Sequence, residues 1–187
     1  MSEISKGIMS KGHLIDDKYK VMFFVKASSF AETYRVKNDQ GKLGLIKIFN
    51  YSKLNTSQFD TEGGVLEISI LKMMSHPNVV KYWDSGELII SNQKFAYLVL
   101  DFISGETLAD KMKRETTMSL YEAKQIILGV LNGLRHIHNL PVPIIHNDIS
   151  NQNIMLDLSG KIPIPKIIDF GYARKINQPN KSYQKTG

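Results

Sequence analysis

The stretch IIHNDISNQNIMLD, Ile144–Asp157, decides how this chain is interpreted. It places Asp148 and Asn153 five residues apart, just before the apolar stretch Ile154–Leu156. A short apolar run bounded by polar turn residues is typical of a β-strand. The sequence therefore predicts an acid and an amide at the entrance of a strand, with no lysine or arginine beside them.

A second strand is predicted at Lys166–Ile168, after the turn sequence DLSGK. The two strands then form one hairpin, and Asp169 follows directly on the second strand. We expect the open end of this hairpin to bring Asn153 and Asp169 together. Two oxygen ligands suit Mg²⁺, which takes its other ligands from water and phosphate. Asp148 lies just outside and is a candidate to orient a hydroxyl or accept its proton.

Composition narrows the class of protein. The chain has 187 residues, 42% of them hydrophobic, which is enough for a folded core of one domain or two small lobes. It has no cysteine, which excludes disulfides and thiolate catalysis. The net charge of +6 fits a basic surface or an anionic ligand. No apolar run approaches a membrane span, and MSEISKGIMSKGH does not resemble a signal peptide. We expect a cytoplasmic protein, with a secreted effector as the alternative, and neither a nucleic-acid nor a membrane partner.

The first half of the chain is predicted to form a mostly antiparallel sheet with one helix, ending near Phe102. The small residues of Ala27–Ser29 separate the strands of a first hairpin, and Lys47 lies inside a third strand, KLGLIKIFN. The helix is predicted in EGGVLEISILKMMS, where apolar residues recur at three-residue steps and Glu67 lies on or beside the apolar face. His76-Pro77-Asn78 ends it, and VVKYWD and FAYLVLDF are two further strands.

The second half is predicted to be mainly helical before the hairpin. A short helix is expected in ISGETLADKMKRE, and Ser119 with Glu122 forms a capping box that opens a long helix ending by Pro141. The apolar residues expected on one broad face of this helix are Leu120, Ala123, Ile126, Ile127, Val130, Leu131, Leu134 and Ile137.

These motifs together resemble the protein kinase family, Ser/Thr type. The catalytic-loop pattern appears as His146-Asn147-Asp148 with Asn153, and D-F-G is intact at 169–171. Lys47 in GLIK resembles the conserved strand lysine of the family, and Glu67 its helix partner. The resemblance runs from about Tyr19 to Lys175 and implies an α+β, two-lobed fold. It divides the chain into an N-terminal extension at 1–18, an N-lobe at 19–102 and an incomplete, mainly helical C-lobe at 103–187.

The resemblance also implies roles for single residues, with ATP and Mg²⁺ as cofactors. Lys47, steadied by Glu67, would hold the α- and β-phosphates, Asn153 and Asp169 would hold Mg²⁺, and Asp148 would orient or deprotonate the acceptor hydroxyl. His146 is expected to be a packing residue. The remaining nucleotide-binding residues are Ser28 in the loop over the phosphates, Thr33 in place of the valine of the second strand, Val25, Leu45, Leu100, Met155 and Ile168 around adenine, Asp101 and Ile103 through their backbones, and Glu106 at the ribose.

Several positions depart from the family pattern. The glycine-rich loop has Lys26, Ser28 and Ala31 in place of its glycines, so a looser cover of the phosphates is expected. Leu45 adds bulk over the adenine. Ser150 stands where Ser/Thr kinases carry a lysine, and Asn147 replaces the arginine that docks a phosphorylated activation loop. These departures predict slow turnover or weak nucleotide binding.

The sequence stops sixteen residues after D-F-G, without an A-P-E motif. We expect a fragment of a longer chain, with a compact minimal kinase as the alternative. The long helix is then expected to expose apolar surface and to favour self-association or a regulatory partner.

Three functions remain open at this stage. The first is ATP- and Mg²⁺-dependent phosphorylation of a protein hydroxyl, Ser or Thr by default. The second is a pseudokinase that binds a nucleotide or a partner without turnover. The third is a small-molecule phosphotransferase of the aminoglycoside type, which shares the H-x-D-x-x-x-x-N pattern.

Overall fold

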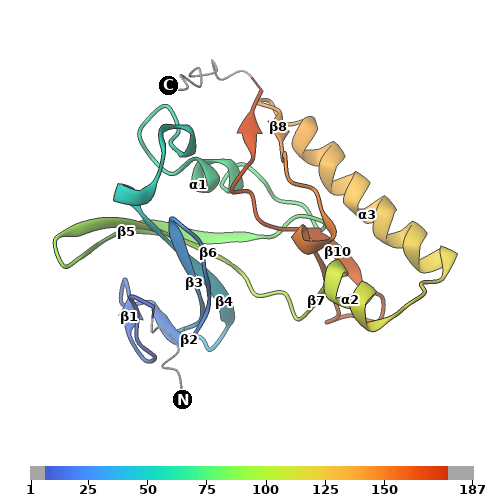
Figure 1. The fold of residues 1–187 in the computed structure, drawn as a ribbon, viewed down its shortest axis with the longest axis horizontal. Helices are drawn as coiled ribbons and strands as arrows, with labels where there is room; N and C mark the ends of the chain where they lie inside the picture. Colours follow the sequence, from blue (N-terminus) through green and yellow to red (C-terminus); the bar gives the residue numbers. More distant parts are fainter. Residues whose placement is uncertain (1–6, 177–187) are drawn as a thin grey trace. The chain divides into compact units, whose positions relative to one another are not determined.

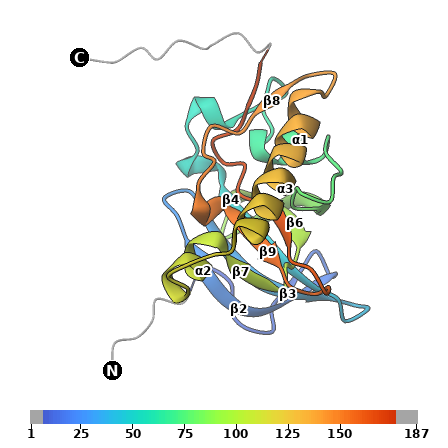
Figure 2. The same ribbon diagram turned by 90° about the vertical axis from the view of Figure 1, so that its right-hand side faces the viewer.

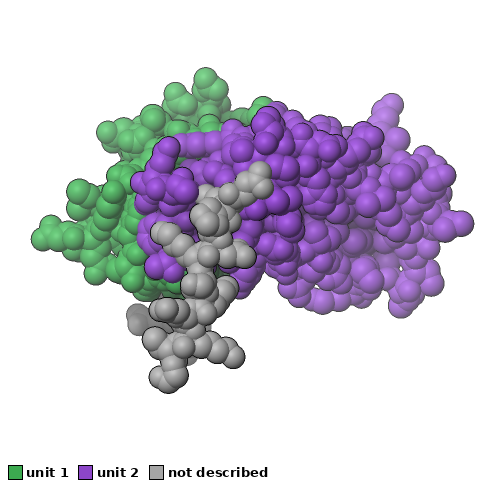
Figure 3. All heavy atoms as spheres, turned by 90° about the horizontal axis from the view of Figure 1, so that it is seen from above, with its two compact units in different colours: residues 1–55, 80–103 green, residues 56–79, 104–187 purple. Residues whose placement is uncertain are grey.

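The structure is a computed structural model that describes residues 7–176, and the chain divides into two compact units (Figure 3). The first unit contains residues 1–55 and 80–103, and the second contains residues 56–79 and 104–187. Residues 56–79, which carry Glu67, therefore belong to the second unit, whereas the sequence analysis placed them in the N-lobe. None of the helices within residues 7–176 is long and apolar enough to cross a membrane.

The first unit is a six-stranded antiparallel sheet in the order β1-β2-β3-β4-β6-β5 (Figure 1). Its strands are β1 (Leu14–Ile15), β2 (Tyr19–Ala27), β3 (Ala31–Asn38), β4 (Leu43–Asn50), β5 (Tyr82–Ile90) and β6 (Gln93–Asp101), with the 3₁₀ turn η1 (Tyr51–Lys53) after β4. The predicted hairpin and third strand are confirmed. Strand β5 begins three residues later than predicted and runs on to Ile90.

The alternation of side chains on β4 separates the core from the face that carries Lys47. Ile46 and Ile48 are buried in a cluster with Val21, Tyr34, Val99 and other apolar residues. Leu45 and Lys47 point to the opposite face and are half-buried, because successive strand residues alternate between faces. Lys47 is therefore positioned by the strand pattern that fills the core behind it.

Within residues 56–79 and 104–176, the second unit combines short sheets with three helices. Its elements are η2 (Thr56–Gln58), α1 (Leu66–Leu71), β7 (Gly105–Thr107), α2 (Leu108–Arg114), α3 (Leu120–His138), β8 (Ile144–Ile145), η3 (Asn151–Asn153), β9 (Ile154–Asp157), β10 (Ile164–Ile167) and β11 (Arg174–Lys175). Strands pair in the orders β10-β9-β7 and β11-β8. The β9–β10 hairpin confirms the prediction, although its second strand begins two residues earlier.

Helix α1 is shorter than the predicted helix because a turn occupies the residues before it. The Asp60 carboxylate accepts hydrogen bonds from the amides of Glu62 and Gly64 at 3.0 and 2.8 Å. Gly63 has a φ of +84°, which a helix cannot accommodate. The helix consequently starts only at Leu66.

Helix α3 has the predicted length but buries a narrower face than predicted. Ile126, Gly129, Gly133 and Ile137 are buried, whereas Leu120, Ile127 and Leu131 are 86, 57 and 53% exposed. The predicted apolar face was therefore too broad: its members Ile126 and Ile137 are buried, while the expectation that this helix exposes apolar surface is confirmed.

Glycines explain which face of α3 is buried. A Cβ atom on Gly129 would overlap the ring of Pro165, and one on Gly133 would lie 2.9 Å from both Asn78 O and Ile167 Cδ1. The helix thus lies against β10 with two residues that have no side chain. Figure 1 labels both elements, and Figure 2 shows α3 facing the viewer. Only half of the capping box forms: Ser119 Oγ accepts from the amide of Glu122 at 3.2 Å, but the Glu122 carboxylate pairs with Lys111.

Asn78 joins the loop after α1 to the same strand. Its Nδ2 donates to Pro165 O at 2.8 Å, and its carbonyl accepts from Ile167 N at 2.9 Å. Val79 forms a parallel bridge with Ile167. Helix α3, this loop and β10 together fix the strand that leads to Asp169.

Candidate functional site

His146 is a buried packing residue at the start of the polar loop, as predicted. It is 1% exposed, and its ring meets the Phe170 ring edge-on at 4.7 Å. Nδ1 accepts from the amide of Asp148 at 3.3 Å, which leaves Nε2 to donate to Ile168 O at 3.1 Å. Burial lowers the pKa of His146 and keeps the imidazole neutral. This residue ties the loop to the D-F-G segment.

Asn153 holds the carboxylate of Asp148 directly. Its Nδ2 donates to Asp148 Oδ2 at 2.7 Å and to Asp148 O at 2.9 Å. The turn η3 places Asn153 for these contacts, with its own amide donating to Ser150 O at 3.0 Å. Because the NH₂ end of the side chain is used by Asp148, the amide oxygen is the end that remains for a cation.

Asp169 follows the last hydrogen bond of the β9–β10 hairpin. The amide of Ile168 donates to Asn153 O at 2.9 Å, so Asn153 lies opposite the residue before Asp169. Asp169 has a φ of +60°, in the left-handed region that aspartate tolerates better than most residues, and its Oδ1 accepts from Gly171 N at 3.4 Å. The structure thus brings Asn153 and Asp169 to the same end of the hairpin. One amide oxygen and one carboxylate fit the hard-oxygen preference of Mg²⁺.

Asn147 has a role that the sequence analysis did not identify. It has a φ of +63°, and its Nδ2 donates to Tyr172 O at 3.1 Å. Strand β8 before it pairs with β11, with Ile145 opposite Arg174. An asparagine in this position both tolerates the left-handed backbone and fastens the segment after D-F-G, and its residue type was the only signal for this role.

Strand register in the first unit groups four of the predicted nucleotide-binding residues. Lys47 lies opposite Thr33 on one side and Leu98 on the other, and Leu45 lies opposite Leu100. The Lys47 ammonium is 5.2 Å from the centre of the Phe49 ring, a cation–π distance. Lys47 is half-buried beside apolar side chains, and the register places two further cations, Arg35 and Lys37, on the same face, opposite Leu45 and Leu43.

The turn between β2 and β3 is closed by Ser28. Its amide donates to Ala31 O at 2.7 Å, and its hydroxyl accepts from Ala31 N at 3.1 Å. Ser28 therefore supplies the turn with hydrogen bonds that do not require glycine. Val25, predicted to line the adenine slot, lies on β2 just before this turn and is 44% exposed.

Two other predicted nucleotide contacts are already engaged within the chain. The amide of Asp101 donates to Lys81 O at 2.9 Å, so this amide is not the group that Asp101 would offer to a base. The Glu106 carboxylate accepts from Nε and Nη2 of Arg114. Met155 lies opposite Thr107 and Lys166 in the β7-β9-β10 sheet, and Ile103 is buried.

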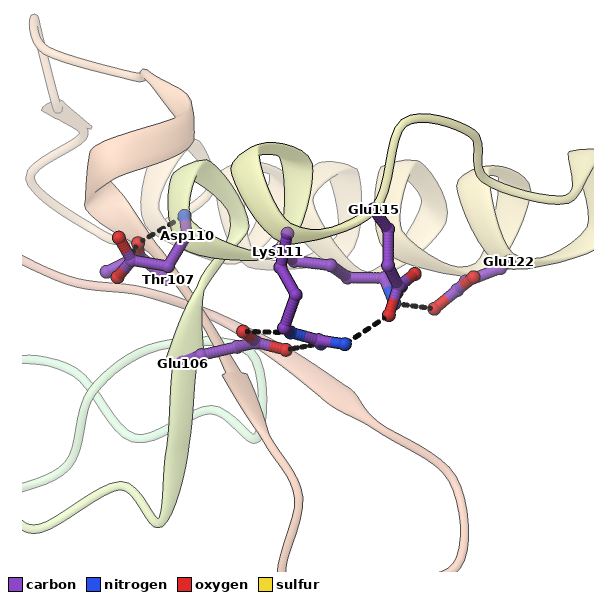
Figure 4. Close-up of polar contacts among 7 residues, drawn as sticks. Glu106, Thr107, Asp110, Lys111, Glu115 and Glu122 are labelled. Carbon is purple, nitrogen blue, oxygen red and sulfur yellow. Dashed lines mark hydrogen bonds and ion pairs between the residues drawn. The ribbon is translucent and has the colours of Figure 1, made fainter.

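Glu106 belongs to a network of charges between β7, α2 and α3 (Figure 4). Lys111, 8% exposed, pairs with Glu115 at 2.6 Å and Glu122 at 3.0 Å. Hydrogen bonds to Glu115 and then to Glu122 raise the pKa of Lys111. This network fixes α2 and the start of α3, while Glu67 lies separately, buried in the first turn of α1.

A histidine pair lies away from the polar loop. The rings of His76 and His136 stack with centroids 4.9 Å apart and planes at 20°. Burial, and then the positive charges of His136, Arg135 and Lys166, lower the pKa of His76. These surroundings therefore favour the neutral imidazole of His76.

The spacing of these motifs agrees with a comparison of the whole sequence against known families. Residues 27–187 match the family described as the protein kinase domain. The chain belongs to the protein kinase family. The matched range includes the segment that carries Asp148, Asn153 and Asp169.

The similar curated proteins are Ser/Thr kinases. The chain is 35% identical over 116 residues to a probable serine/threonine-protein kinase PknB of Bifidobacterium longum, covering 59% of this chain and 16% of that protein. It is 34% identical over 161 residues to calcium-dependent protein kinase 5 of Plasmodium berghei, covering 85 and 26%. It is 30% identical over 165 residues to human serine/threonine-protein kinase Nek5, covering 86 and 22%. The chain thus spans about a quarter or less of these relatives.

Proposed function

We propose that this chain is the ATP- and Mg²⁺-dependent catalytic region of a Ser/Thr protein kinase. The first unit corresponds to the N-lobe, and the second to an incomplete C-lobe together with the segment that carries Glu67. The observation that carries the proposal is the Asn153 amide, which fixes the Asp148 carboxylate at 2.7 Å at the end of the hairpin that leads to Asp169. An amide that orients one acid beside a second acid suits phosphoryl transfer.

In the proposed reaction, the hydroxyl oxygen of the substrate attacks the γ-phosphorus of ATP. The bond from this phosphorus to the bridging oxygen of ADP breaks, and Asp148 accepts the hydroxyl proton. Lys47 binds the α- and β-phosphates. Asn153 Oδ1 and Asp169 would hold Mg²⁺, which when bound supplies neutralisation of the phosphate charge. Asn153 has the further task of keeping Asp148 in one orientation.

A nucleotide-binding module without turnover is the second candidate. It is favoured by the turn at Ser28, whose hydroxyl takes part in closing the turn, and by Ser150, which adds no charge near the γ-phosphate. A missing cation at such a position costs up to roughly a thousandfold or more in rate. The two candidates share ATP binding and differ in transfer.

The first experiment measures thermal unfolding with and without ATP and Mg²⁺. Ligand at 100 times its Kd adds roughly 2.7 kcal/mol to the stability of the folded state. We expect a magnesium-dependent rise in Tm that Asp169→Asn abolishes, since asparagine keeps the left-handed backbone but removes the charge. No rise in the wild-type protein would refute nucleotide binding and both candidates.

The second experiment measures phosphate transfer from labelled ATP to a generic protein substrate. Asp148→Asn should remove transfer while retaining the ATP-dependent rise in Tm. The matched control is Asp157→Asn, an acid of the same hairpin at the end away from Asn153. ATP binding without transfer in the wild-type protein would select the non-catalytic candidate.

A further inference from the structure

Arg35 on β3 is held between two aromatic rings instead of by an acid. Its Cζ lies 4.1 Å from the centre of the Phe102 ring and 5.5 Å from that of Phe23. Its Nε is buried and has no hydrogen-bond partner within residues 7–176. A buried donor without a partner costs free energy, so the contacts with the ring faces must offset this cost.

The residue before Phe102 is held from the other side of the sheet. The Asp101 carboxylate accepts from Trp83 Nε1 at 3.1 Å and pairs with Lys42 at 3.3 Å. The Lys42 ammonium lies 4.1 Å from the centre of the Trp83 ring. Successive side chains of an extended segment point in opposite directions, so Asp101 and Phe102 are gripped on opposite faces.

These contacts on Asp101 and Phe102 hold the segment that the proposed function assigns to the base of ATP. The backbone groups of Asp101 and Ile103 would hydrogen-bond to adenine, and they can select this base only if the backbone is held in a fixed position. Arg35 also lies opposite Leu45 in the strand register, next to a residue expected to line the adenine slot.

We infer that Arg35 is a positioning residue for base recognition, because it clamps Phe102 and thereby fixes the backbone of residues 101–103. The choice of ATP as the ligand rests on the proposed function, whereas the effect of Arg35 on the backbone of residues 101–103 does not. Arg35 need not touch the nucleotide. Its removal lowers the population of the binding-competent segment, and the apparent Kd rises in inverse proportion to that population.

The expected effect follows from the strength of cation–π contacts. Loss of one such contact corresponds to about twofold to thirtyfold in an equilibrium constant. We expect Arg35→Met to weaken ATP binding within this range. GTP binding should weaken less. The backbone hydrogen bonds of residues 101–103 are expected to fit adenine and not guanine, so displacing this backbone removes bonds that only ATP makes. The ratio of ATP to GTP affinity should therefore fall.

The test compares Mg·ATP and Mg·GTP binding by calorimetry for four proteins, each with all 187 residues: the wild type and three variants. Arg35→Met keeps an unbranched side chain without the charge, and Arg35→Lys restores a cation over Phe102. Lys37→Met is the matched control, since Lys37 is an exposed cation on the same face of β3. We expect a lower ATP-to-GTP ratio for Arg35→Met, partial recovery for Arg35→Lys and no change for Lys37→Met.

Hydrogen exchange of the amides at 101–103, measured without nucleotide, tests the clamp separately. Arg35→Met should speed exchange there, and Lys37→Met should not. Unchanged exchange would overturn the inference, whatever the wild-type protein binds. An equal loss of ATP and GTP affinity would also overturn it, since that result describes general destabilisation. Absence of ATP binding by the wild-type protein would refute the proposed function while leaving the exchange result to decide on the clamp.

Discussion

Replacement of Gly129 by alanine tests the close approach of α3 to β10. In an open helix this change stabilises by about 1 kcal/mol, because alanine is the better helix former. Here the added methyl group would overlap the Pro165 ring and lie 3.0 Å from Asn78 Nδ2. The ring cannot rotate away, since its strand is held to Asn78 by two hydrogen bonds. Overpacking of this kind costs about 1 to 3 kcal/mol.

The balance is a net destabilisation of up to about 2 kcal/mol, or a fall in Tm of up to about 8 °C for a chain of this size. Urea unfolding followed by circular dichroism measures it. Asn132→Ala, at an exposed position of the same helix, is the control and should raise stability by a few tenths of a kcal/mol. A Gly129→Ala protein that is more stable than the wild type would show that the helix does not touch the strand.

Three further outcomes are expected. The pKa of His76 is lowered in the folded state, so the unfolded chain binds the proton more tightly, and the free energy of unfolding should fall as pH drops below about 6.5. Replacement of this residue, His76→Phe, should reduce the difference in urea midpoint between pH 7.5 and 5.5. Lys111→Met should lower Tm more than Lys113→Met, because only Lys111 is buried between two carboxylates. Asn153→Ala should lower the rate of phosphate transfer at least tenfold, about 1.4 kcal/mol, because Asp148 loses its charge-assisted hydrogen bond; an unaltered rate at saturating magnesium would contradict the role given to this amide.

The polar end of the β9–β10 hairpin could be predicted from sequence because its geometry is local. Two apolar runs and a turn rich in Ser and Gly specify the pairing, and the pairing places Asn153 and Asp169 at one end. The same holds for Lys47, whose neighbours Ile46 and Ile48 indicate by alternation which face is the core.

The face of α3 could not be predicted in the same way. The periodicity of apolar side chains predicted that Leu120, Ile127 and Leu131 lie on the buried face, but all three are exposed. The buried face depends on Gly129 and Gly133, whose value lies in the backbone approach of β10 and Asn78. That approach is a tertiary contact, and no local pattern encodes it.

The clamp at Arg35 was invisible for a related reason. A single arginine in a strand is most simply interpreted as a solvent-exposed residue. Its two partners, Phe23 and Phe102, come from β2 and from the segment after β6, and only the sheet order brings all three together. The ion pair of Glu106 with Arg114, by contrast, joins residues that are close in sequence, across one turn and a short helix.

The pairing of Asn78 with Pro165 has a consequence for synthesis on the ribosome. These partners are 87 residues apart, although both belong to the second unit. At ordinary translation rates the strand β10 is made roughly 4 to 17 s after Asn78 leaves the peptidyl-transferase centre. During this delay the strands of the first unit, which end at Asp101, are all synthesised, while Asn78 and Val79 of the second unit still lack their strand partner β10. The loop after the helix that carries Glu67 is thus among the last parts of the chain to gain its native partners, and a nascent chain arrested before Pro165 would leave the Asn78 side chain without its acceptor.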